Sequence, residues 1–486
     1  MSWAEVYPWS TPAPGEPVLR CVEGQVRRAI CEGALGAGSR LPSSRQLAGR
    51  LGVARATVVG AYEQLRAEGY VESRAGAGTF VAADLADLTL RRRPSPPVAD
   101  PPSLPERALD FGPVPPILGL AGEALFNTGR TRMDERALAA WRRAARAVAR
   151  SLGPEHFGYS DPAGNPELRA EIAGYLRAAR GVVCEPEQVV VTTGAQQAID
   201  IATRVLVEPG AAVWVEDPGY AATTRALASW GADLRPIPVD ASGLVVAEGL
   251  RTSPRARAAY VAPSHQYPLG VTLSMGRRAE LLAWAREAGA WIVEDDYASE
   301  FRYDGPPLTA LQGLDGGQRV LYVGTFNKAI FPGLRLGYLV VPTALLPAVL
   351  RARQLLDRCP PSLTQAIVLE FMRAGEFAAH IRRRRAAYRA QRDALAAALL
   401  AHCRDWLEPD VPGQGMHLIA YLRGGVSDLA AEAAAAGEDV IARAISPLHR
   451  AAPPRQGLML GFSGFAPEAM GGPARRLRAA LAGLVS

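Results

Sequence analysis

A proline-rich segment divides this sequence into two parts, and each part must build a core of its own. From Ala83 to Glu106 the chain has six prolines and the run Arg91-Arg92-Arg93, with no helical or strand period. Such a composition is typical of a semi-stiff linker. A chain of 486 residues is also too long for one ordinary core. We therefore predict a first domain over residues 1–82, a linker over residues 83–108 and a second domain over residues 109–486.

The first part reads as short helices followed by a hairpin. Apolar residues recur at helical spacing in three segments between Leu19 and Arg66. Strand patterns at Tyr70–Ser73 and Thr79–Val81 then flank the Gly-rich turn Arg74–Gly78. Helix, turn, helix and hairpin in this order predict an α+β winged helix-turn-helix domain.

The second part alternates strand-like apolar runs with helical patterns, which predicts an α/β domain with a mostly parallel sheet flanked by helices. Four of its strands lead into polar turns, at the strand ends where α/β folds bind ligands. These turns are Thr192–Gln197, Glu216–Tyr220, Glu294–Tyr297 and Gly324–Lys328.

The last of these turns contains Lys328, the single lysine among 54 Lys and Arg residues. A guanidinium stays protonated and cannot condense with an aldehyde, whereas a desolvated lysine amine can form a Schiff base. Lys328 is therefore a candidate covalent anchor for an aldehyde cofactor. The alternative is a surface lysine that has no chemical role.

Residues in the other turns are candidates for holding such a cofactor. Gly194 precedes a predicted helix whose free N–H groups suit a phosphate, and Arg335 could clamp the same group. Tyr220 could stack on a ring or fill the core. A buried carboxylate such as Asp295 needs a partner, which a protonated pyridine nitrogen would supply, and Tyr297 could hydrogen-bond a ring hydroxyl.

The first part resembles a GntR-type DNA-binding domain. The segments that carry the resemblance are Gly33–Ala48, Leu51–Val58, Glu68–Tyr70 and Gly76–Val81. It implies DNA contacts by Arg45, Arg55, Thr57, Gly76 and Gly78, with the two glycines in a wing that reaches a minor groove. Ala54 departs from the family, where a Ser N-cap is common, and should weaken that helix start by about 1 kcal/mol. The alternative is a surface helical pair with solvated arginines.

From about Leu109 to the C-terminus, the ordered turns resemble the fold-type I aminotransferases, with a smaller C-terminal α/β part. The resemblance implies pyridoxal 5′-phosphate as cofactor, held as an internal aldimine by Lys328. Asp295 would then pair with the pyridine nitrogen, Tyr297 would contact the ring oxygen and Tyr220 would stack on the ring. The implied phosphate contacts are Gly194, Ala195, Gln196, Thr325 and Arg335. Tyr159 would reach the phosphate of a partner subunit, so the resemblance also implies a homodimer.

A GntR-type head before such a body resembles the MocR/GabR group of transcription regulators. Tyr267, in Pro263–Gly270, occupies the place where true aminotransferases usually have Asn. Spacing from the C-terminal strand puts their carboxylate-binding Arg at Gln456, with Arg455 beside it, and leaves open which of the two faces the ligand. Ala222 stands where some members carry another Arg.

The sequence thus predicts a transcription regulator that depends on pyridoxal 5′-phosphate and binds operator half-sites in double-stranded DNA. Its small-molecule effector would be pyridoxal 5′-phosphate, an amine or an amino acid, and its target vitamin B6 or amine metabolism. One alternative is a working aminotransferase that carries a DNA-binding head, and another is a DNA-binding scaffold with an inactive pocket. Whether transamination occurs stays open.

Three further features bear on location and metals. The first residues do not have the pattern of a signal peptide, and no apolar run approaches the ~20 residues of a membrane span. The five cysteines are scattered, without metal-ligand or disulfide spacing. We expect reduced thiols, no metal site, no membrane partner and a cytoplasmic location. The net charge of +6 permits DNA binding without arguing for it.

Overall fold

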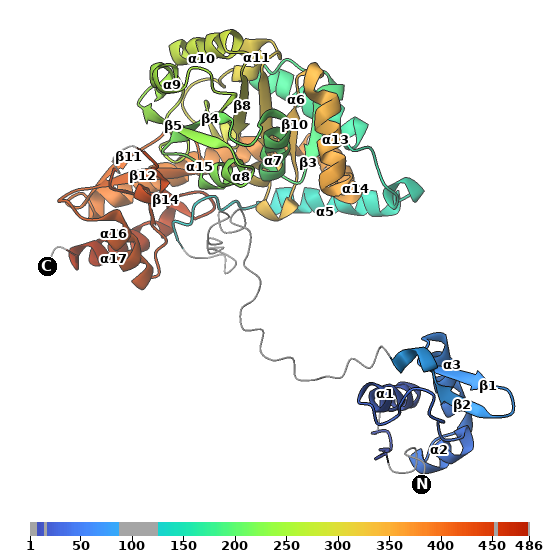
Figure 1. The fold of residues 1–486 in the computed structure, drawn as a ribbon. Helices are drawn as coiled ribbons and strands as arrows, with labels where there is room; N and C mark the ends of the chain where they lie inside the picture. Colours follow the sequence, from blue (N-terminus) through green and yellow to red (C-terminus); the bar gives the residue numbers. More distant parts are fainter. Residues whose placement is uncertain (1–6, 14–16, 87–124, 452–454, 485–486) are drawn as a thin grey trace. The chain divides into compact units, whose positions relative to one another are not determined.

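The computed structural model describes residues 7–13, 17–86, 125–451 and 455–484. The chain divides into two compact units, Met1–Leu104 and Pro105–Ser486, which we call the head and the body (Figure 1). Within the described ranges, no helix has the length and apolar character that a membrane crossing requires.

The head has the predicted winged helix-turn-helix order. Its elements are α1 (Val18–Cys31), α2 (Ser44–Leu51), α3 (Arg55–Ala67), β1 (Val71–Arg74) and β2 (Gly78–Val81). The Ser43 hydroxyl caps α2 and pairs with Gln46 in a capping box, and Gly52 ends that helix in the left-handed conformation. Ala54 starts α3 without a side-chain cap, as the sequence predicts.

The first residues of the predicted linker pack against the head. Residues Ala83–Ala86 form a short 3-10 helix, η2, and Leu85 packs on the apolar core of the head. The rest of the predicted linker, residues 87–108, lies outside the described residues. So do residues 109–124, where the second domain is predicted to begin.

The body is built on an eight-stranded sheet in the order β3-β10-β9-β8-β7-β4-β5-β6. The strands are β3 (Val189–Thr192), β4 (Ala212–Asp217), β5 (Asp233–Asp240), β6 (Gly243–Leu244), β7 (Ala258–Val261), β8 (Trp291–Asp296), β9 (Val320–Thr325) and β10 (Gly337–Val340). Strand β10 runs antiparallel to both β3 and β9, whereas β9, β8, β7, β4 and β5 are mutually parallel. The carboxyl ends of β3, β9, β8, β7 and β4 therefore meet at one edge of the sheet.

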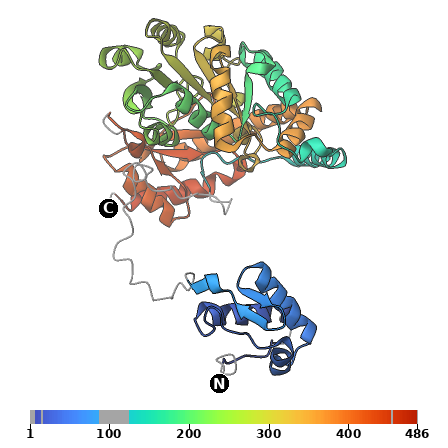
Figure 2. The same ribbon diagram turned by 45° about the vertical axis from the view of Figure 1, so that its right-hand side comes forward.

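Helices cover both faces of this sheet (Figures 1 and 2). They are α5 (Glu135–Arg150), α6 (Pro166–Arg180), α7 (Ala195–Leu206), α8 (Ala221–Ser229), α9 (Val246–Thr252), α10 (Met275–Glu287), α11 (Leu311–Asp315), α12 (Phe326–Ala329), α13 (Leu346–Asp357), α14 (Ser362–Arg373) and α15 (Glu376–His402). Helices α7, α8 and α13 enclose one apolar cluster with the sheet, and α9 and α10 enclose another. This arrangement is the predicted α/β class.

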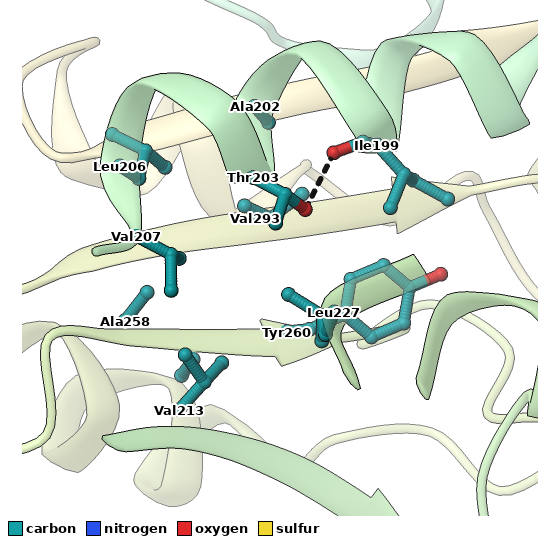
Figure 3. Close-up of a pocket in the computed structure, with 11 residues that line it drawn as sticks. Ile199, Ala202, Thr203, Leu206, Val207, Val213, Leu227, Ala258, Tyr260 and Val293 are labelled. Carbon is teal, nitrogen blue, oxygen red and sulfur yellow. Dashed lines mark hydrogen bonds between the residues drawn. The ribbon is translucent and has the colours of Figure 1, made fainter. Parts of the chain in front are cut away.

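The layer between α7 and the sheet is closely packed (Figure 3). Ile199 and Leu206 of α7 face Val213 and Val293 of the strands, and the remaining space is a cavity of 10 Å³. A cavity needs roughly 10–15 Å³ and polar partners to hold one water. The layer is thus core, and it holds α7 in a fixed position above the sheet.

The C-terminal part is smaller and has a sheet of its own. Its antiparallel strands lie in the order β11-β12-β14-β13. The elements are β11 (Leu407–Asp410), β12 (His417–Leu422), β13 (Arg443–Ala444), β14 (Gly457–Gly461), α16 (Asp428–Gly437) and α17 (Gly471–Ala482). Helices α16 and α17 lie side by side against this sheet (Figure 1), which agrees with the predicted smaller α/β part.

Candidate functional site

A cavity of 380 Å³ lies in the body, where the carboxyl ends of the central strands meet the start of α7 and the C-terminal part. The structure brings most of the predicted site residues to it. Those that line the cavity are Ala195, Gln196, Tyr220, Asp295, Tyr297, Thr325, Lys328 and Arg335. Among the described residues, no group of three or more His, Cys, Asp or Glu side chains could hold a metal ion.

Lys328 lies on α12, directly after β9. The Thr325 hydroxyl at the end of β9 caps this short helix by accepting a hydrogen bond from the Asn327 N–H at 3.1 Å. Burial lowers the pKa of the Lys328 amine, and the positive charge of Arg443 lowers it further. A lowered pKa increases the neutral fraction of the amine, which is the nucleophilic form.

Asp295 points to the opposite face of β8 from its two acidic neighbours. The sequence suggests three acids after a strand, but all three are the last residues of the strand itself. Because side chains alternate along a strand, Glu294 and Asp296 face away from the cavity. There Asp296 pairs with Arg180 at 2.8 Å, and Glu294 accepts a hydrogen bond from the Leu311 N–H at 2.9 Å. Asp295 alone of the three lines the cavity.

Two buried oxygen atoms in the cavity wall have no hydrogen-bond partner among the residues that the structure describes. The Tyr260 hydroxyl donates to Oδ2 of Asp295, but Oδ1 of Asp295 is buried without a partner, as is the hydroxyl of Tyr297. Burial raises the pKa of Asp295 to about 6. Unsatisfied buried polar atoms are rare in proteins, so these two mark places for polar groups of a ligand.

The opposite end of the cavity suits an anion. Gly194 begins α7 at a φ of 119°, and the first-turn N–H groups of Ala195 and Gln196 have no intrahelical partner. A Cβ on Gly194 would lie 2.9 Å from Nδ2 of Asn327 and 3.7 Å from Nη1 of Arg335. Within the described chain, Arg335 forms no salt bridge. A helix start and an unpaired guanidinium together form a cradle for phosphate.

Two tyrosines form the aromatic wall. Tyr220 lines the cavity and is 42% exposed, so it is not a core residue. Its ring meets the ring of Tyr267 edge to face, with centroids 5.4 Å apart. Tyr267 in turn packs on the apolar face of the C-terminal sheet. The pair can bound a flat ring on one side.

Tyr159, which is predicted to contact the cofactor of a partner subunit, does not line the cavity of its own chain. Its side chain is 80% exposed, and the guanidinium of Arg358 lies 5.0 Å from its ring centroid. A contact across a dimer therefore stays a prediction.

The prediction of a ligand-facing residue at Gln456 or Arg455 is wrong. Oε1 of Gln456 accepts a hydrogen bond from the Asp428 N–H at 2.7 Å, and Arg455 stacks 3.4 Å from the ring centroid of Tyr421. Both side chains precede β14 and turn toward neighbouring elements of the C-terminal part. The arginine that lines the cavity from this part is Arg443. It lies on β13, a strand of only two residues that leaves no pattern in the sequence.

The segment before α5, residues 127–129, also lines the cavity, although the sequence did not predict it. The Gly461 N–H at the end of β14 donates to the Phe126 carbonyl at 2.7 Å and holds this segment in place. Gly129, at a φ of 75°, passes so close to Lys328 that a Cβ would meet its Nζ. Glycine suits both this backbone conformation and the close approach to Lys328, but a single glycine in the sequence does not predict either. The other lining residues not proposed as cofactor contacts are Asn127, Thr128, Glu216, Tyr260, Ala262, Tyr267, Asn327, Pro332, Met416 and His417.

The head presents its candidate DNA contacts at the predicted places. Arg45 and Arg55 are exposed in the first turns of α2 and α3, and Nε of Arg55 donates to the Ser44 hydroxyl at 3.2 Å. Thr57 is half-buried in the first turn of α3. Gly76 and Gly78 lie in the hairpin turn, at φ values of 72° and 114°.

Comparison with known families matches both units. The family "Bacterial regulatory proteins, gntR family" matches residues 20–81, and "Aminotransferase class I and II" matches residues 123–449. A probable rhizopine catabolism regulatory protein, MocR, of Rhizobium meliloti is 40% identical over 97% of this chain and 95% of its own. The pyridoxine biosynthesis transcriptional regulator PdxR of Corynebacterium glutamicum is 36% identical over 76% of each chain.

Solved structures resemble the body. An α-aminoadipate aminotransferase from Thermus thermophilus superposes with a TM-score of 0.68 and 28% identity, over 75% of this chain and 93% of its own. That enzyme was solved with N-(5′-phosphopyridoxyl)-L-leucine, a phosphopyridoxyl compound.

The cavity fits pyridoxal 5′-phosphate, the cofactor of this class. An amine with a lowered pKa, a buried carboxylate with one free oxygen, an aromatic wall and an anion cradle correspond to the aldehyde, ring nitrogen, ring and phosphate of that molecule. With its GntR-family head and its class I and II aminotransferase body, the chain belongs to the MocR-type transcription regulators, which depend on pyridoxal 5′-phosphate.

Proposed function

We propose that this regulator senses pyridoxal 5′-phosphate, or an amino compound that reacts with it, at Lys328. The observation that carries the proposal is the place of the chain's single lysine. Its amine has a lowered pKa and lies in a cavity that also contains a carboxylate with one unsatisfied oxygen and a guanidinium that forms no salt bridge with the described residues. A bound pyridoxal group supplies a carbonyl that amines attack.

We propose the following contacts for the bound cofactor. The free Oδ1 of Asp295 would hold a proton on the ring nitrogen, and the hydroxyl of Tyr297 would donate to the ring oxygen. Tyr220 would cover the ring. The phosphate would be bound by the residues at the start of α7 and around Arg335, namely Gly194, Ala195, Gln196, Thr325 and Arg335.

The proposed active form is a homodimer. Phe157 and Tyr159 are 75% and 80% exposed, and Leu355 is 88% exposed. The segment of Phe157 and Tyr159 lies beside the end of α13, the helix of Leu355, because the guanidinium of Arg358 is 5.0 Å from the ring centroid of Tyr159. Exposed apolar surface of this kind is typical of an interface, and it would carry Tyr159 toward the cavity of a second copy. Two heads would then bind two operator half-sites.

The proposed role is control of genes for vitamin B6 or amine metabolism, in the cytoplasm. The printed names of two relatives, a pyridoxine biosynthesis regulator and a rhizopine catabolism regulator, support these two areas. In the head, we assign DNA contacts to Arg45, Arg55 and Thr57, with Gly76 and Gly78 in the wing.

The test measures DNA binding and turnover in the same preparation. Affinity for an operator selected from random duplex DNA is measured with and without pyridoxal 5′-phosphate, for the full chain and for Lys328→Ala. We expect a cofactor-dependent change in the full chain and none in the variant, with basal DNA binding kept. Arg404→Ala, at an exposed position, is the control and should respond like the full chain.

Two results would contradict the proposal. An unchanged cofactor response in Lys328→Ala would show that sensing does not pass through this amine. Robust multiple turnover of an amino donor and a keto acid would favour the alternative of a working aminotransferase with a DNA-binding head.

A further inference from the structure

Helix α5 of the body carries a positively charged stripe that the cofactor cavity does not use. The helix contains five arginines and a single acidic residue, Glu135, which lies in the first turn, where the helix dipole favours a negative charge. At 3.6 residues per turn, the five arginines fall within an arc of about 120°. They are Arg136, Arg142, Arg143, Arg146 and Arg150, and all are exposed. A stripe of one sign produces a field that attracts a partner of the opposite charge.

The opposite side of α5 fixes this stripe in place. The Asp134 carboxylate caps the helix by accepting a hydrogen bond from the Ala137 N–H at 2.7 Å. Trp141 packs edge to face on Phe371 of α14, with ring centroids 5.8 Å apart. The residues buried on this side are small: Ala137, Ala140, Ala144 and Val148. The arginines therefore extend from the outer side of a helix that is held firmly on the body (Figure 1).

Little negative charge compensates the stripe within the described residues. Arg143 forms a salt bridge with Glu376 at 2.8 Å, and it is the only one of the five arginines that does so there. Asp134 lies just before the first turn, but it pairs with Arg383 at 2.8 Å. The other four guanidinium groups of the stripe thus have no ionic partner in the described part of the chain.

The helix dipole explains only one end of the stripe. It favours a basic residue in the last turn, which is Arg150. Arg142, Arg146 and Arg150 follow one another at intervals of four residues, a spacing at which like charges on a helix repel each other. A bound polyanion would remove this repulsion, so the stripe is suited to such a partner.

We propose that the arginine stripe of α5 binds the phosphate backbone of double-stranded DNA beside the operator, so that the body adds contacts to those of the head. From Arg136 to Arg150 the helix rises by about 21 Å at 1.5 Å per residue. This length corresponds to about six base pairs at 3.4 Å each. Because the GntR-family head and the body belong to one chain, DNA bound by the head is present at the body at a high effective concentration. The inference does not require the proposed sensing of a cofactor.

The side chains between the arginines favour DNA over an anionic membrane. Helices that lie on membranes insert large apolar side chains among the lipids. Within the arc of the stripe, Ala139 is the only apolar residue of α5. Phosphates at a DNA surface require only charge and hydrogen-bond donors, which guanidinium groups supply.

The experiment compares two duplexes by fluorescence anisotropy at several salt concentrations. The short duplex contains only the operator, and the long duplex extends it on each side by about 20 base pairs, roughly three times the length of the stripe. Each phosphate contact adds about 0.9 to the slope of log affinity against log salt concentration. We expect the full chain to bind the long duplex more tightly and with the steeper slope.

The test variant combines Arg136→Gln, Arg146→Gln and Arg150→Gln. Because it removes three phosphate contacts, its slope on the long duplex should fall in magnitude by about 2.7, while its binding to the short duplex stays as it is. Replacing the same three arginines by Lys keeps the charge and should restore the slope. A melting curve for each variant confirms that it is folded.

The matched control removes three exposed arginines from α17, where they do not form one stripe. It combines Arg475→Gln, Arg476→Gln and Arg478→Gln. The net charge changes by the same amount as in the test variant, but we expect the control to keep the preference for the long duplex. An equal loss in both variants would show an effect of net charge and would contradict a binding surface on α5.

Two other results would also overturn the inference. One is equal binding of both duplexes by the full chain, which is expected if the stripe binds an acidic protein instead. The other is a test variant that keeps the slope of the full chain on the long duplex. The titrations are repeated with pyridoxal 5′-phosphate, so a missing cofactor response, which counts against the proposed function, is read separately from the effect of duplex length.

Discussion

Replacing Asp295 by Asn should stabilise the cofactor-free protein and weaken cofactor binding at the same time. Asp295 is buried, its Oδ1 has no partner, and its pKa is raised from 3.8 to about 6. A carboxyl with a raised pKa destabilises the folded state wherever it is ionised. Asn keeps an oxygen that can accept the Tyr260 hydroxyl but carries no charge to desolvate.

The magnitude follows from the pKa of Asp295. Below its unfolded pKa of 3.8 the carboxyl is protonated in both states and costs nothing. The cost grows as the pH rises from about 4 to 6 and is complete above that range. One pKa unit corresponds to 1.36 kcal/mol, so the full cost is about 3 kcal/mol at pH 8 and about half of that at pH 5.

The assay is heat denaturation of the cofactor-free full chain and of Asp295→Asn at both pH values. We expect a higher melting temperature of the body for the variant, with the larger gain at pH 8. Titration with pyridoxal 5′-phosphate should show a weaker affinity, by roughly 10-fold or more, because the charged partner of the ring nitrogen is lost. A variant that is destabilised, or that binds the cofactor as tightly as the original chain, would refute this reasoning.

Three further substitutions test other parts of the account. Ala54→Ser should add a hydroxyl cap to α3 and stabilise the head by about 1 kcal/mol, which calorimetry of the head transition would detect; no gain would contradict the uncapped start. Gly194→Ala should weaken cofactor binding, because the new Cβ would lie 2.9 Å from Nδ2 of Asn327 and because alanine is strained at a φ of 119°. An unchanged affinity in the absorbance titration would show that Gly194 does not belong to the phosphate site. Arg55→Ala should weaken operator binding by about 1–3 kcal/mol if the guanidinium contacts a base. If it contacts a phosphate instead, the slope of log affinity against log salt concentration should fall in magnitude by about 1. Fluorescence anisotropy at several salt concentrations separates the two contacts, and an unchanged affinity would exclude both.

Much of the site could be predicted because its residues follow strands directly along the chain. Asp295 at the end of β8 and Lys328 after β9 lie at the same edge of the sheet, since parallel strands bring their carboxyl ends together. The head could be predicted for a similar reason. Its helix ends and its hairpin depend on local signals, such as Gly52 and the Gly-rich turn.

The residues that escaped prediction reach the cavity through long-range packing. Arg443 lies on a two-residue strand whose position depends on pairing with β14, and Gly129 is held in place by the end of the same strand. The placement of Gln456 was wrong for a related reason. Counting back from β14 along the chain cannot show that the side chain turns to the start of α16 rather than to the cavity.

The most direct test of the account is to locate the covalent bond to the cofactor. Because Lys328 is the single lysine of the chain, it provides the only side-chain amine that can be trapped by borohydride reduction of the loaded protein. Mass spectrometry of the digested protein should find one phosphopyridoxyl group per chain, on the peptide that contains Lys328, and none in Lys328→Ala. A cofactor adduct on the N-terminal amine, or no adduct in a protein that still responds to pyridoxal 5′-phosphate, would contradict the central role of Lys328.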